Sequence, residues 1–316
     1  MANVSILGLG AMGSRMALHL TGGEHALTIW SRSRGSAQDA LIASGAARRA
    51  STIRDAAARA DVVVSMVRDD EAARSIWLVP EVGALDAMRP GAIAIESSTL
   101  TPRCVRDLAA AASSRGVRFL EAPVVGSRPQ AEAASLIYLV GGDRAVLDDV
   151  APVLRRMGSV IHHVGPVGHA AVLKLAVNAM LAVQVAALAE TLSLVETAGL
   201  DLARAVDVLG ALPVCSPAAK AAASSMVAHA FAPSFPVALA TKDLGYALDV
   251  AAELSLQPPL LRATRDVLAT AIARGHAADH LTSLIALYRD PSGRDLVASV
   301  PDHASPPSID AKGSPT

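Results

Sequence analysis

The sequence has few cysteines, few aromatic side chains and almost no net charge. Its 316 residues include 2 Cys, 3 Phe, 2 Trp and 3 Tyr, and 28 Lys and Arg are balanced by 29 Asp and Glu. Cys104 and Cys215 are too few and too far apart for a disulfide framework or a metal site, which favours a reducing, cytoplasmic location. Without a basic surplus or aromatic rings for base stacking, the composition gives no reason to expect a nucleic-acid partner.

Segments typical of targeting or membrane insertion are also missing. The first residues carry no basic region before their apolar stretch, so we expect no signal peptide. The most apolar segment, 175–195, is interrupted by Asn178, Gln184 and Glu190, which favours a buried helix over a membrane span. The histidines have no partners at metal-ligand spacing, so we expect no metal site.

The first half of the chain alternates short β-rich runs with Ala-rich amphipathic stretches. Strands are expected at 4–7, 27–30, 61–66, 92–96, 117–121, 136–140 and 160–164. Several of these runs are continuously apolar, which is typical of strands that helices cover on both faces. The pattern predicts an α/β fold, with a doubly wound, parallel Rossmann-type sheet in a nucleotide-binding domain over residues 1–164.

The second half has a different periodicity. From Gly165 to about Tyr288 helix-length apolar patterns dominate, broken by glycine and proline. We predict an all-helical substrate and dimerisation domain over residues 165–290. Residues 291–316 are rich in Pro and Ser and poor in apolar side chains, so we expect a disordered tail there.

A glycine-rich loop directly follows the first expected strand and precedes a helical stretch. Gly8 permits the tight turn, Gly10 lets the backbone approach a diphosphate, and Gly13 lets the helix pack closely on the strand. The helix N-terminus adds unpaired N–H groups for phosphate oxygens. The alternative is a simple strand-to-helix turn. The predicted dinucleotide loop consists of Gly8, Leu9, Gly10, Ala11, Met12 and Gly13.

The end of the second expected strand indicates which dinucleotide binds. An acidic side chain there would bind the ribose 2′-hydroxyl of NAD. This chain instead has Ser31, Arg32, Ser33 and Arg34, whose guanidinium and hydroxyl groups suit a 2′-phosphate. We therefore predict NADP rather than NAD. The alternative is that the two arginines are solvated loop residues.

Four separated motifs resemble the β-hydroxyacid dehydrogenase family, which includes 3-hydroxyisobutyrate dehydrogenase, tartronate semialdehyde reductase and glyoxylate/succinic semialdehyde reductases. They are the glycine loop, the stretch EAPVVGS at 121–127, the stretch GHAAVLKLAVN at 168–178, and the pair Lys242-Asp243. The resemblance implies a Rossmann domain joined by a long helix to a helical domain, with the active site between them. It implies Lys174 as the catalytic acid/base and Asn178 as a substrate-binding or lysine-positioning residue.

The resemblance also implies further binding residues around the cofactor. Ser98 or Thr99, in the stretch that follows the fourth expected strand, would contact the nicotinamide ribose region, with Thr99 assigned to the cofactor and Ser98 also to the substrate. Met66 and Val67 would line the adenosine side. Lys242 would contact the cofactor from the helical domain.

The substrate-binding stretch of this chain departs from the family pattern. Val125, Gly126 and Ser127 stand where Ser-Gly-Gly is usual, so a hydroxyl donor is lost at Val125 and Ser127 replaces it only in part. Glycine there lets backbone N–H groups point at a substrate carboxylate. Arg128 offers another anchor for an anion, although its residue type and position favour a surface arginine. A larger or less polar carbonyl substrate is compatible with these changes.

The residues themselves support a chemical role for Lys174. Lys174 and Asn178 are four residues apart, so they share one face of a helix whose other residues are mostly apolar. A partly desolvated lysine has a lowered pKa and exchanges a proton with a developing alkoxide near neutral pH. The alternative is a lysine that extends to water at the helix edge.

These observations together predict an NADP-dependent oxidoreductase that interconverts a small β-hydroxyacid and its aldehyde or keto acid. Two other functions stay open, an imine reductase-like activity and a cofactor-binding scaffold without turnover. Lys174 argues against both, because such relatives usually lack that lysine. The apolar surplus of the helical half predicts a homodimer or homotetramer.

Overall fold

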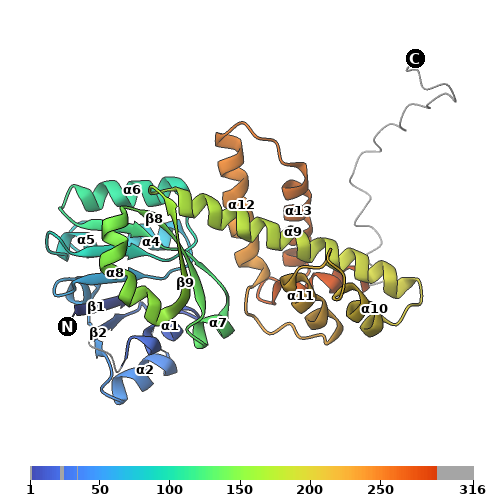
Figure 1. The fold of residues 1–316 in the computed structure, drawn as a ribbon, viewed down its shortest axis with the longest axis horizontal. Coiled ribbons are helices and arrows are strands. Elements are labelled where there is room, and N and C mark those ends of the chain that lie inside the picture. The colour runs from blue at the N-terminus through green and yellow to red at the C-terminus, as the bar shows by residue number, and fades with distance from the viewer. Residues whose placement is uncertain (1, 22–24, 34, 290–316) are drawn as a thin grey trace.

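The computed structural model describes residues 2–21, 25–33 and 35–289. An α/β part comes first and a helical part follows, and one long helix, α9 (His169–Thr197), runs from the first to the second (Figure 1). The predicted fold class is confirmed. Arg34 and the predicted tail at 291–316 lie outside the described residues.

The α/β part is built on one nine-stranded sheet. The strands are β1 (Ala2–Leu7), β2 (His25–Trp30), β3 (Arg48–Arg49), β4 (Val62–Ser65), β5 (Ile93–Glu96), β6 (Arg118–Glu121), β7 (Val124–Val125), β8 (Leu136–Gly142) and β9 (Gly158–Gly165). Their order is β3-β2-β1-β4-β5-β6-β8-β7, and β9 pairs with β8. All seven expected strands are present. The two that the sequence did not predict, β3 and β7, have two residues each, too few to show a pattern.

The sheet is parallel from β3 to β6, but β8 runs antiparallel to both β6 and β7. The expectation of a wholly parallel sheet is therefore wrong at this end. Only residues 126–135 separate β7 from β8. A parallel crossover needs about a dozen residues or more, so the chain returns antiparallel instead. Strand β9 then pairs with β8 in parallel.

Helices cover both faces of the sheet. They are α1 (Gly13–His19), α2 (Ser36–Ala43), α3 (Ile53–Ala57), α4 (Asp70–Trp77), α5 (Ala84–Ala87), α6 (Pro102–Ser113), α7 (Arg128–Glu132) and α8 (Arg144–Met157). Adjacent residues of β4 enter opposite cores: Val62 and Val64 pack on the α1 and α8 side, and Val63 packs on the α4 and α6 side. This explains why the strands are continuously apolar.

The helical part surrounds α9. Its other members are α10 (Leu202–Leu209), α11 (Pro217–Val227), α12 (Val237–Glu253), α13 (Pro259–Ala273), the 3₁₀ helix η1 (Leu281–Ile285) and α14 (Ala286–Arg289). By length and composition α9 is the one helix among the described residues that would be able to span a membrane. It packs against α11, α12, α13 and η1, and it carries the buried polar residues Lys174 and Asn178. These contacts make it the central helix of a helical domain, as the sequence predicted.

Candidate active site

The glycine loop has the geometry that a dinucleotide requires. Gly8 has φ +94°, and a Cβ there would collide with the carbonyl oxygen of Met66. A Cβ at Gly13 would collide with the carbonyl oxygen of Gly8, so helix α1 packs against the strand end only because residue 13 is glycine. A Cβ at Gly10, in contrast, would meet no atom within 4 Å.

The open side of Gly10 lies at the start of α1, whose N-terminus has no side-chain cap. The N-cap is Met12, whose side chain has no oxygen that would accept a hydrogen bond from the first N–H groups of the helix. Free N–H groups and an approachable backbone fit the diphosphate of a nicotinamide dinucleotide. The residues of the loop therefore suit a nicotinamide dinucleotide, as the sequence predicted.

The turn after β2 leaves its polar side chains available. Arg32 and Ser33 are exposed and Ser31 is half-buried. The Ser33 carbonyl oxygen accepts a hydrogen bond from Nε2 of Gln38 (3.1 Å), which fixes the backbone of the turn. Within the described part of the chain, Arg32 forms no ion pair.

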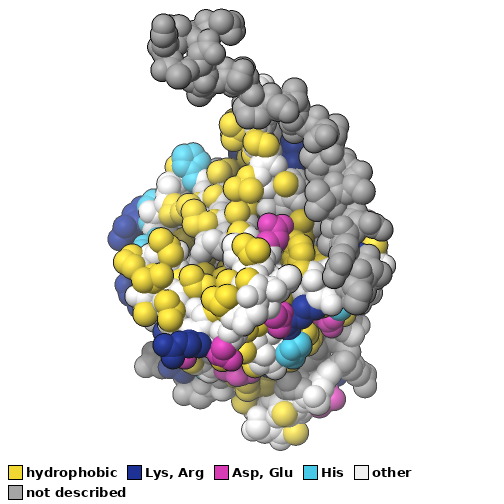
Figure 2. Space-filling view, turned by 90° about the vertical axis from the view of Figure 1, so that its right-hand side faces the viewer, with side chains coloured by type: hydrophobic (Ala, Val, Ile, Leu, Met, Phe, Trp, Pro, Cys, Tyr) yellow, Lys and Arg dark blue, Asp and Glu magenta, His cyan; other side chains and the backbone are white. Residues whose placement is uncertain are grey.

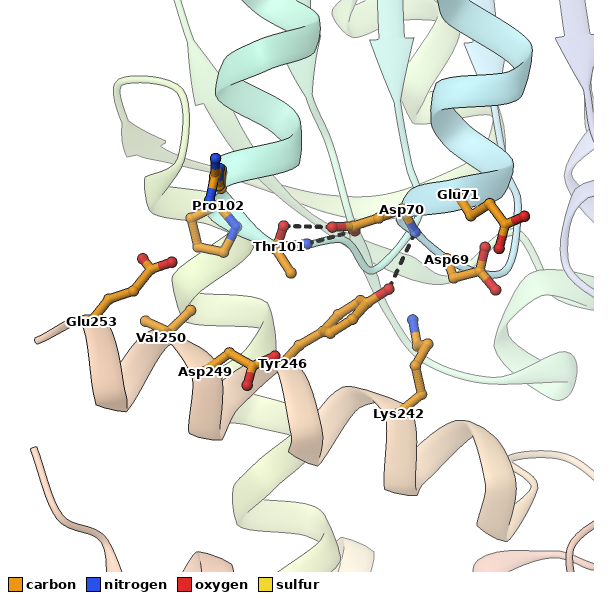
Figure 3. Close-up of a pocket in the computed structure, with 11 residues that line it drawn as sticks. Asp69, Asp70, Glu71, Thr101, Pro102, Lys242, Tyr246, Asp249, Val250 and Glu253 are labelled. Carbon is orange, nitrogen blue, oxygen red and sulfur yellow. Dashed lines mark hydrogen bonds between the residues drawn. The ribbon is translucent and has the colours of Figure 1, made fainter.

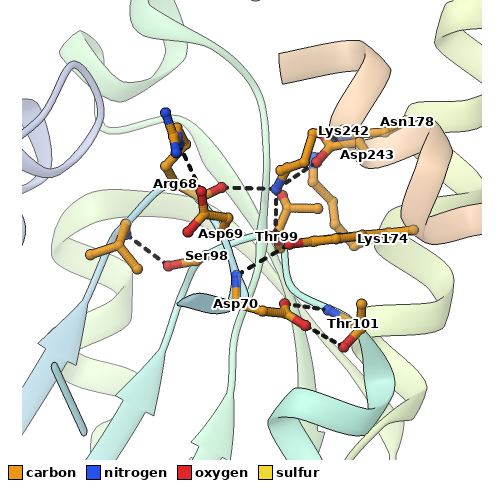
Figure 4. Close-up of polar contacts among 12 residues, drawn as sticks. Arg68, Asp69, Asp70, Ser98, Thr99, Thr101, Lys174, Asn178, Lys242 and Asp243 are labelled. Atoms are coloured by element: carbon orange, nitrogen blue, oxygen red, sulfur yellow. Dashed lines mark hydrogen bonds and ion pairs between the residues drawn. The ribbon is translucent and has the colours of Figure 1, made fainter. Parts of the chain in front are cut away.

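A buried polar chain joins helices α9 and α12 near the carboxyl ends of β4 and β5 (Figure 4). Lys174 Nζ donates to Asn178 Oδ1 (2.8 Å), and Asn178 Nδ2 donates to Asp243 Oδ2 (2.6 Å). Asp243 forms an ion pair with the neighbouring Lys242 (2.9 Å). Lys174 and Asn178 are both 7% exposed, and Asp243 is 2% exposed.

The environment of Lys174 favours loss of its proton. The pKa of Lys174 is lowered to about 8: burial is the main cause, the charge of Asp243 opposes the shift, and the charge of Lys242 adds to it. Burial dominates because an ammonium loses its hydration inside the protein. The sequence predicted a desolvated lysine beside Asn178, but it assigned no role to Asp243.

Lys242 ties the helical domain to two loops of the Rossmann domain. Its ammonium donates to the carbonyl oxygens of Arg68 and Thr99, both at 2.8 Å (Figure 4). It also lies 4.8 Å from the ring centroid of Tyr246. The hydroxyl of Tyr246 accepts from the backbone N–H of Asp70 (3.2 Å). Helix α12 thus holds the loops that follow β4 and β5, where the cofactor residues were predicted.

Two buried carboxylates end neighbouring strands at this edge of the sheet. Glu96 and Glu121 are register partners in β5 and β6, and both are 0% exposed. Glu96 accepts from Trp77 Nε1 (2.7 Å) and from the backbone N–H of Ser98 (2.8 Å). Ser98 Oγ in turn accepts from the backbone N–H of Val67 (2.8 Å). Glu96 therefore shapes the loop that carries Ser98.

Glu121 fixes the start of α9. Its carboxylate accepts from the backbone N–H groups of Gly168 (2.5 Å), Ala170 (3.0 Å) and Ala171 (3.1 Å). Burial raises the pKa of the Glu121 carboxyl, and the three N–H groups and the charge of Arg106 oppose that rise. The sequence predicted no role for Glu96 or Glu121. Each of them is the last residue of an apolar strand. An acidic residue at such a position indicates a buried carboxylate with hydrogen-bond partners.

The predicted substrate stretch lies at the domain junction, where both donors of Ser127 are paired. Ser127 Oγ donates to the carbonyl oxygen of Ser234 in the helical domain (3.2 Å), and the Ser127 N–H donates to Gln130 Oε1 (2.9 Å). Gly126 has φ +128°, where a Cβ would crowd Gln130 and Leu136. Arg128 is half-buried, so it is less exposed than the sequence predicted.

A cavity of about 580 Å³ opens on the outer side of this junction, between α4, α6 and α12 (Figure 3). Its acidic lining residues are Asp69, Asp70, Glu71, Asp249 and Glu253. The cavity touches neither the glycine loop nor Lys174, and it shares only Lys242 with the polar chain. These carboxylates would repel an anion such as a dinucleotide phosphate. The Asp69–Glu71 run starts helix α4, with Asp69 as N-cap.

The chain is similar to known proteins over most of its length. Residues 3–165 match the NAD-binding domain of 6-phosphogluconate dehydrogenase, and residues 168–288 match the NAD-binding domain of NADP-dependent 3-hydroxyisobutyrate dehydrogenase. The chain belongs to the β-hydroxyacid dehydrogenase family. It is accordingly an NAD(P)-dependent oxidoreductase that acts on CH–OH groups.

Individual relatives are similar to this chain over most of its length. A probable 3-hydroxyisobutyrate dehydrogenase of Mycobacterium tuberculosis is 35% identical over 89% of this chain and 94% of its own length. An NAD-dependent L-serine dehydrogenase of Pseudomonas aeruginosa is 33% identical over 82% of this chain and 89% of its own. The solved structure of M. tuberculosis 3-hydroxyisobutyrate dehydrogenase with L-serine is 32% identical, with a TM-score of 0.81 over 92% of this chain and 100% of that one.

Proposed function

We propose that this β-hydroxyacid dehydrogenase interconverts a small β-hydroxyacid and its aldehyde or keto acid, uses NADP, and employs Lys174 as the acid/base. The observation that carries the proposal is the buried Lys174 ammonium, hydrogen-bonded to Asn178 and with its pKa lowered to about 8. A group with that pKa holds and releases a proton near physiological pH.

The chain's own residues account for the proton transfer. The bound nicotinamide supplies or accepts the hydride. In reduction, Lys174 Nζ donates a proton to the oxygen of the carbonyl as negative charge develops there, and in oxidation neutral Lys174 takes the proton back from the hydroxyl. Asn178 Oδ1 orients the ammonium, and Asp243 fixes the Asn178 amide from the other side.

NADP is proposed over NAD on the turn after β2. Arg32 is exposed and Ser31 and Ser33 flank it, so a guanidinium and two hydroxyls stand where NAD enzymes carry an acidic side chain. The relatives do not decide this point, since one matched domain is named as NADP-dependent and one relative as NAD-dependent.

A substrate screen tests the proposal. The purified chain is incubated with NADPH or NADH and with glyoxylate, succinic semialdehyde, tartronate semialdehyde or a cyclic imine, and oxidation of the cofactor is followed at 340 nm. The reverse direction uses NADP⁺ with 3-hydroxyisobutyrate or L-serine. We expect turnover of an aldehyde acid with NADPH. Turnover of the cyclic imine alone would instead favour the imine reductase-like function, and cofactor binding without turnover would favour the scaffold.

We also propose that the enzyme is a homodimer or homotetramer formed through its helical domain. Hydrophobic side chains gather on the end of that domain (Figure 2). The exposed apolar residues there include Leu194, Leu200, Val208 and Val214, of which Val214 is 85% exposed. Apolar patches of this kind are uncommon on monomers and typically mark an interface, and a second copy of the same patch forms a two-fold contact.

A further inference from the structure

Helix α12 is hydrogen-bonded to the Rossmann domain through two side chains. Lys242 and Tyr246 are four residues apart, so they lie one turn from each other on the same side of the helix. Among the described residues, every side-chain hydrogen bond between α12 and the Rossmann domain involves one of these two. Further along the helix, Asp249 and Glu253 instead line the cavity of about 580 Å³ (Figure 3). Lys242 and Tyr246 together form the α12 clamp.

Tyr246 contributes two different contacts to the clamp. Its ring centroid lies 4.8 Å from Lys242 Nζ, which is within the range of a cation–π contact. Its hydroxyl accepts a hydrogen bond from the backbone N–H of Asp70 (3.2 Å) (Figure 3). Asp70 is the first residue of α4, where the N–H groups of a helix have no carbonyl oxygen of their own helix to bond. An aliphatic side chain at this position would make neither contact.

The groups that the clamp holds belong to two neighbouring loops. Lys242 donates to the carbonyl oxygen of Arg68, in the loop that follows β4, and to that of Thr99, in the loop that follows β5. Asp70 in turn accepts from the N–H (2.9 Å) and the hydroxyl (2.6 Å) of Thr101, the N-cap of α6. The clamp therefore fixes both loops against α12, at the edge of the sheet where ligands bind in α/β folds.

The clamp is continuous with the buried polar chain. Asp243, which follows Lys242 in α12, forms an ion pair with it (2.9 Å) and accepts from the Asn178 amide (2.6 Å). Asn178 in turn accepts from Lys174 (2.8 Å). The loop that follows β4 also packs closely against the glycine loop. Polar contacts thus run from Lys174 through α12 to a loop that lies against the predicted cofactor site.

We propose that Tyr246 is a positioning residue for proton transfer. It holds the Lys242 ammonium, and Lys242 fixes α12, with the polar chain that ends at Lys174, against the loops that follow β4 and β5. The inference rests on the proposed function, because it concerns where Lys174 lies relative to the cofactor. The alternative is that Lys242 acts on the cofactor by itself and that Tyr246 only fills space. The experiments separate the two.

The kinetic test compares Tyr246→Leu, Lys242→Met and the double variant with the wild type. Each is assayed with NADPH and whichever of glyoxylate, succinic semialdehyde and tartronate semialdehyde the wild type reduces fastest. Lys220→Met, at an exposed lysine of the helical domain, is the matched control. We expect Tyr246→Leu to lower kcat about 3- to 30-fold, as loss of a partly buried cation–π contact does. The KM for NADPH should stay within about twofold, since the glycine loop is unchanged.

The double variant shows whether Tyr246 acts through Lys242. It should be no slower than Lys242→Met alone, because a residue that acts by holding Lys242 has no effect once Lys242 is gone. Tyr246→Phe, which keeps the ring, should recover most of the loss in kcat. Additive losses, or equal losses in Tyr246→Phe and Tyr246→Leu, would contradict the proposal. A raised KM for NADPH with an unchanged kcat in Lys242→Met would assign that lysine to the cofactor and overturn the clamp.

Hydrogen–deuterium exchange tests the clamp without turnover. The Tyr246 hydroxyl bonds the Asp70 amide, so exchange over residues 68–72 should be faster in Tyr246→Phe and Tyr246→Leu than in the wild type and Lys220→Met. Equal exchange in all four proteins would contradict the contact itself. Faster exchange with an unchanged kcat would overturn the positioning role and leave the proposed function intact. A wild type that reduces no aldehyde acid would contradict the proposed function, and the exchange rates would still test the clamp.

Discussion

The carboxylate of Glu121 accepts a hydrogen bond from the backbone N–H of Ala170, one helical turn before Lys174. Together with the bonds from Gly168 and Ala171, this contact joins the end of β6 to the start of α9. A buried anion at the N-terminus of a helix is favourable because it pairs free N–H groups and complements the helix dipole. This carboxylate therefore helps to fix how α9 is turned about its axis and where it starts. The position of Lys174 depends on both.

Glu121→Gln should therefore impair both stability and catalysis. The amide puts an NH₂ group against three N–H donors or leaves one of them unpaired, at a cost of about 1–3 kcal/mol. We expect a lower Tm and a reduced kcat, with the KM for NADPH unchanged, because none of these three hydrogen bonds of Glu121 involves the glycine loop. Glu71→Gln, at an exposed carboxylate of the same domain that forms no ion pair among the described residues, is the control for thermal unfolding and kinetics. A full-activity Glu121→Gln would contradict this positioning role.

Lys174→Ala should abolish most turnover without weakening cofactor binding. Loss of a positioned general acid/base reduces kcat by about 10²–10⁴-fold. Lys174→Arg should not restore activity, because a guanidinium stays protonated and cannot exchange the proton. Asn178→Ala should raise KM and lower kcat together, since Asn178 contacts the Lys174 ammonium. Steady-state kinetics measures kcat and KM, and fluorescence titration measures NADPH binding. A kcat near that of the wild type in Lys174→Ala would show that another group is the acid.

The pH dependence of kcat should differ between the two directions. Lys174 has a pKa of about 8 and must be protonated to act as an acid in reduction. Reduction should accordingly slow as the pH rises through 8, whereas oxidation, which needs neutral lysine, should accelerate over the same range. Asp243→Asn removes the anion that raises the pKa of Lys174, so both midpoints should move to lower pH. Profiles that do not move in Asp243→Asn would contradict the electrostatic coupling.

Arg32→Asp should change the choice of cofactor. The substitution removes a phosphate partner, introduces repulsion toward a 2′-phosphate and supplies an acceptor for a 2′-hydroxyl. We expect kcat/KM to fall with NADPH and to rise with NADH, while Lys174-dependent turnover is retained. The kinetics of both cofactors with both proteins check this. A wild type that already prefers NADH would show that the interpretation of this turn is wrong.

Val208→Lys should weaken self-association if the helical domain forms the interface. Val208 is 54% exposed in one copy, and burying a charge without a partner in an interface is unfavourable. Light scattering at micromolar concentration should give a smaller mass than for the wild type. Val82→Lys, at a 51% exposed valine of the Rossmann domain, should leave the mass unchanged. A monomeric wild type would contradict the proposed assembly.

Local sequence patterns determined most of the architecture. Apolar runs predicted the seven long strands, because the spacing of buried side chains follows the repeat of the backbone. The change to helical periodicity near Gly165 predicted the second domain. The glycine spacing between a strand and a helix predicted the loop at Gly8–Gly13, because steric limits at those positions act over a few residues. Lys174 and Asn178 were found in the same way, since one helical turn places them on one face.

Only the tertiary structure decided which distant groups complete the site. Asp243 lies 65 residues from Asn178, and Glu121 lies 47 residues from Gly168, so no local pattern links them. The Ser127 hydroxyl meets Ser234 across 107 residues, while Arg128 next to it finds no partner in the described chain. The periodicity of apolar residues in the sequence indicates which side chains are buried. The partner that a buried polar group meets depends on how whole helices and strands pack against one another, and that packing is fixed only when the chain folds.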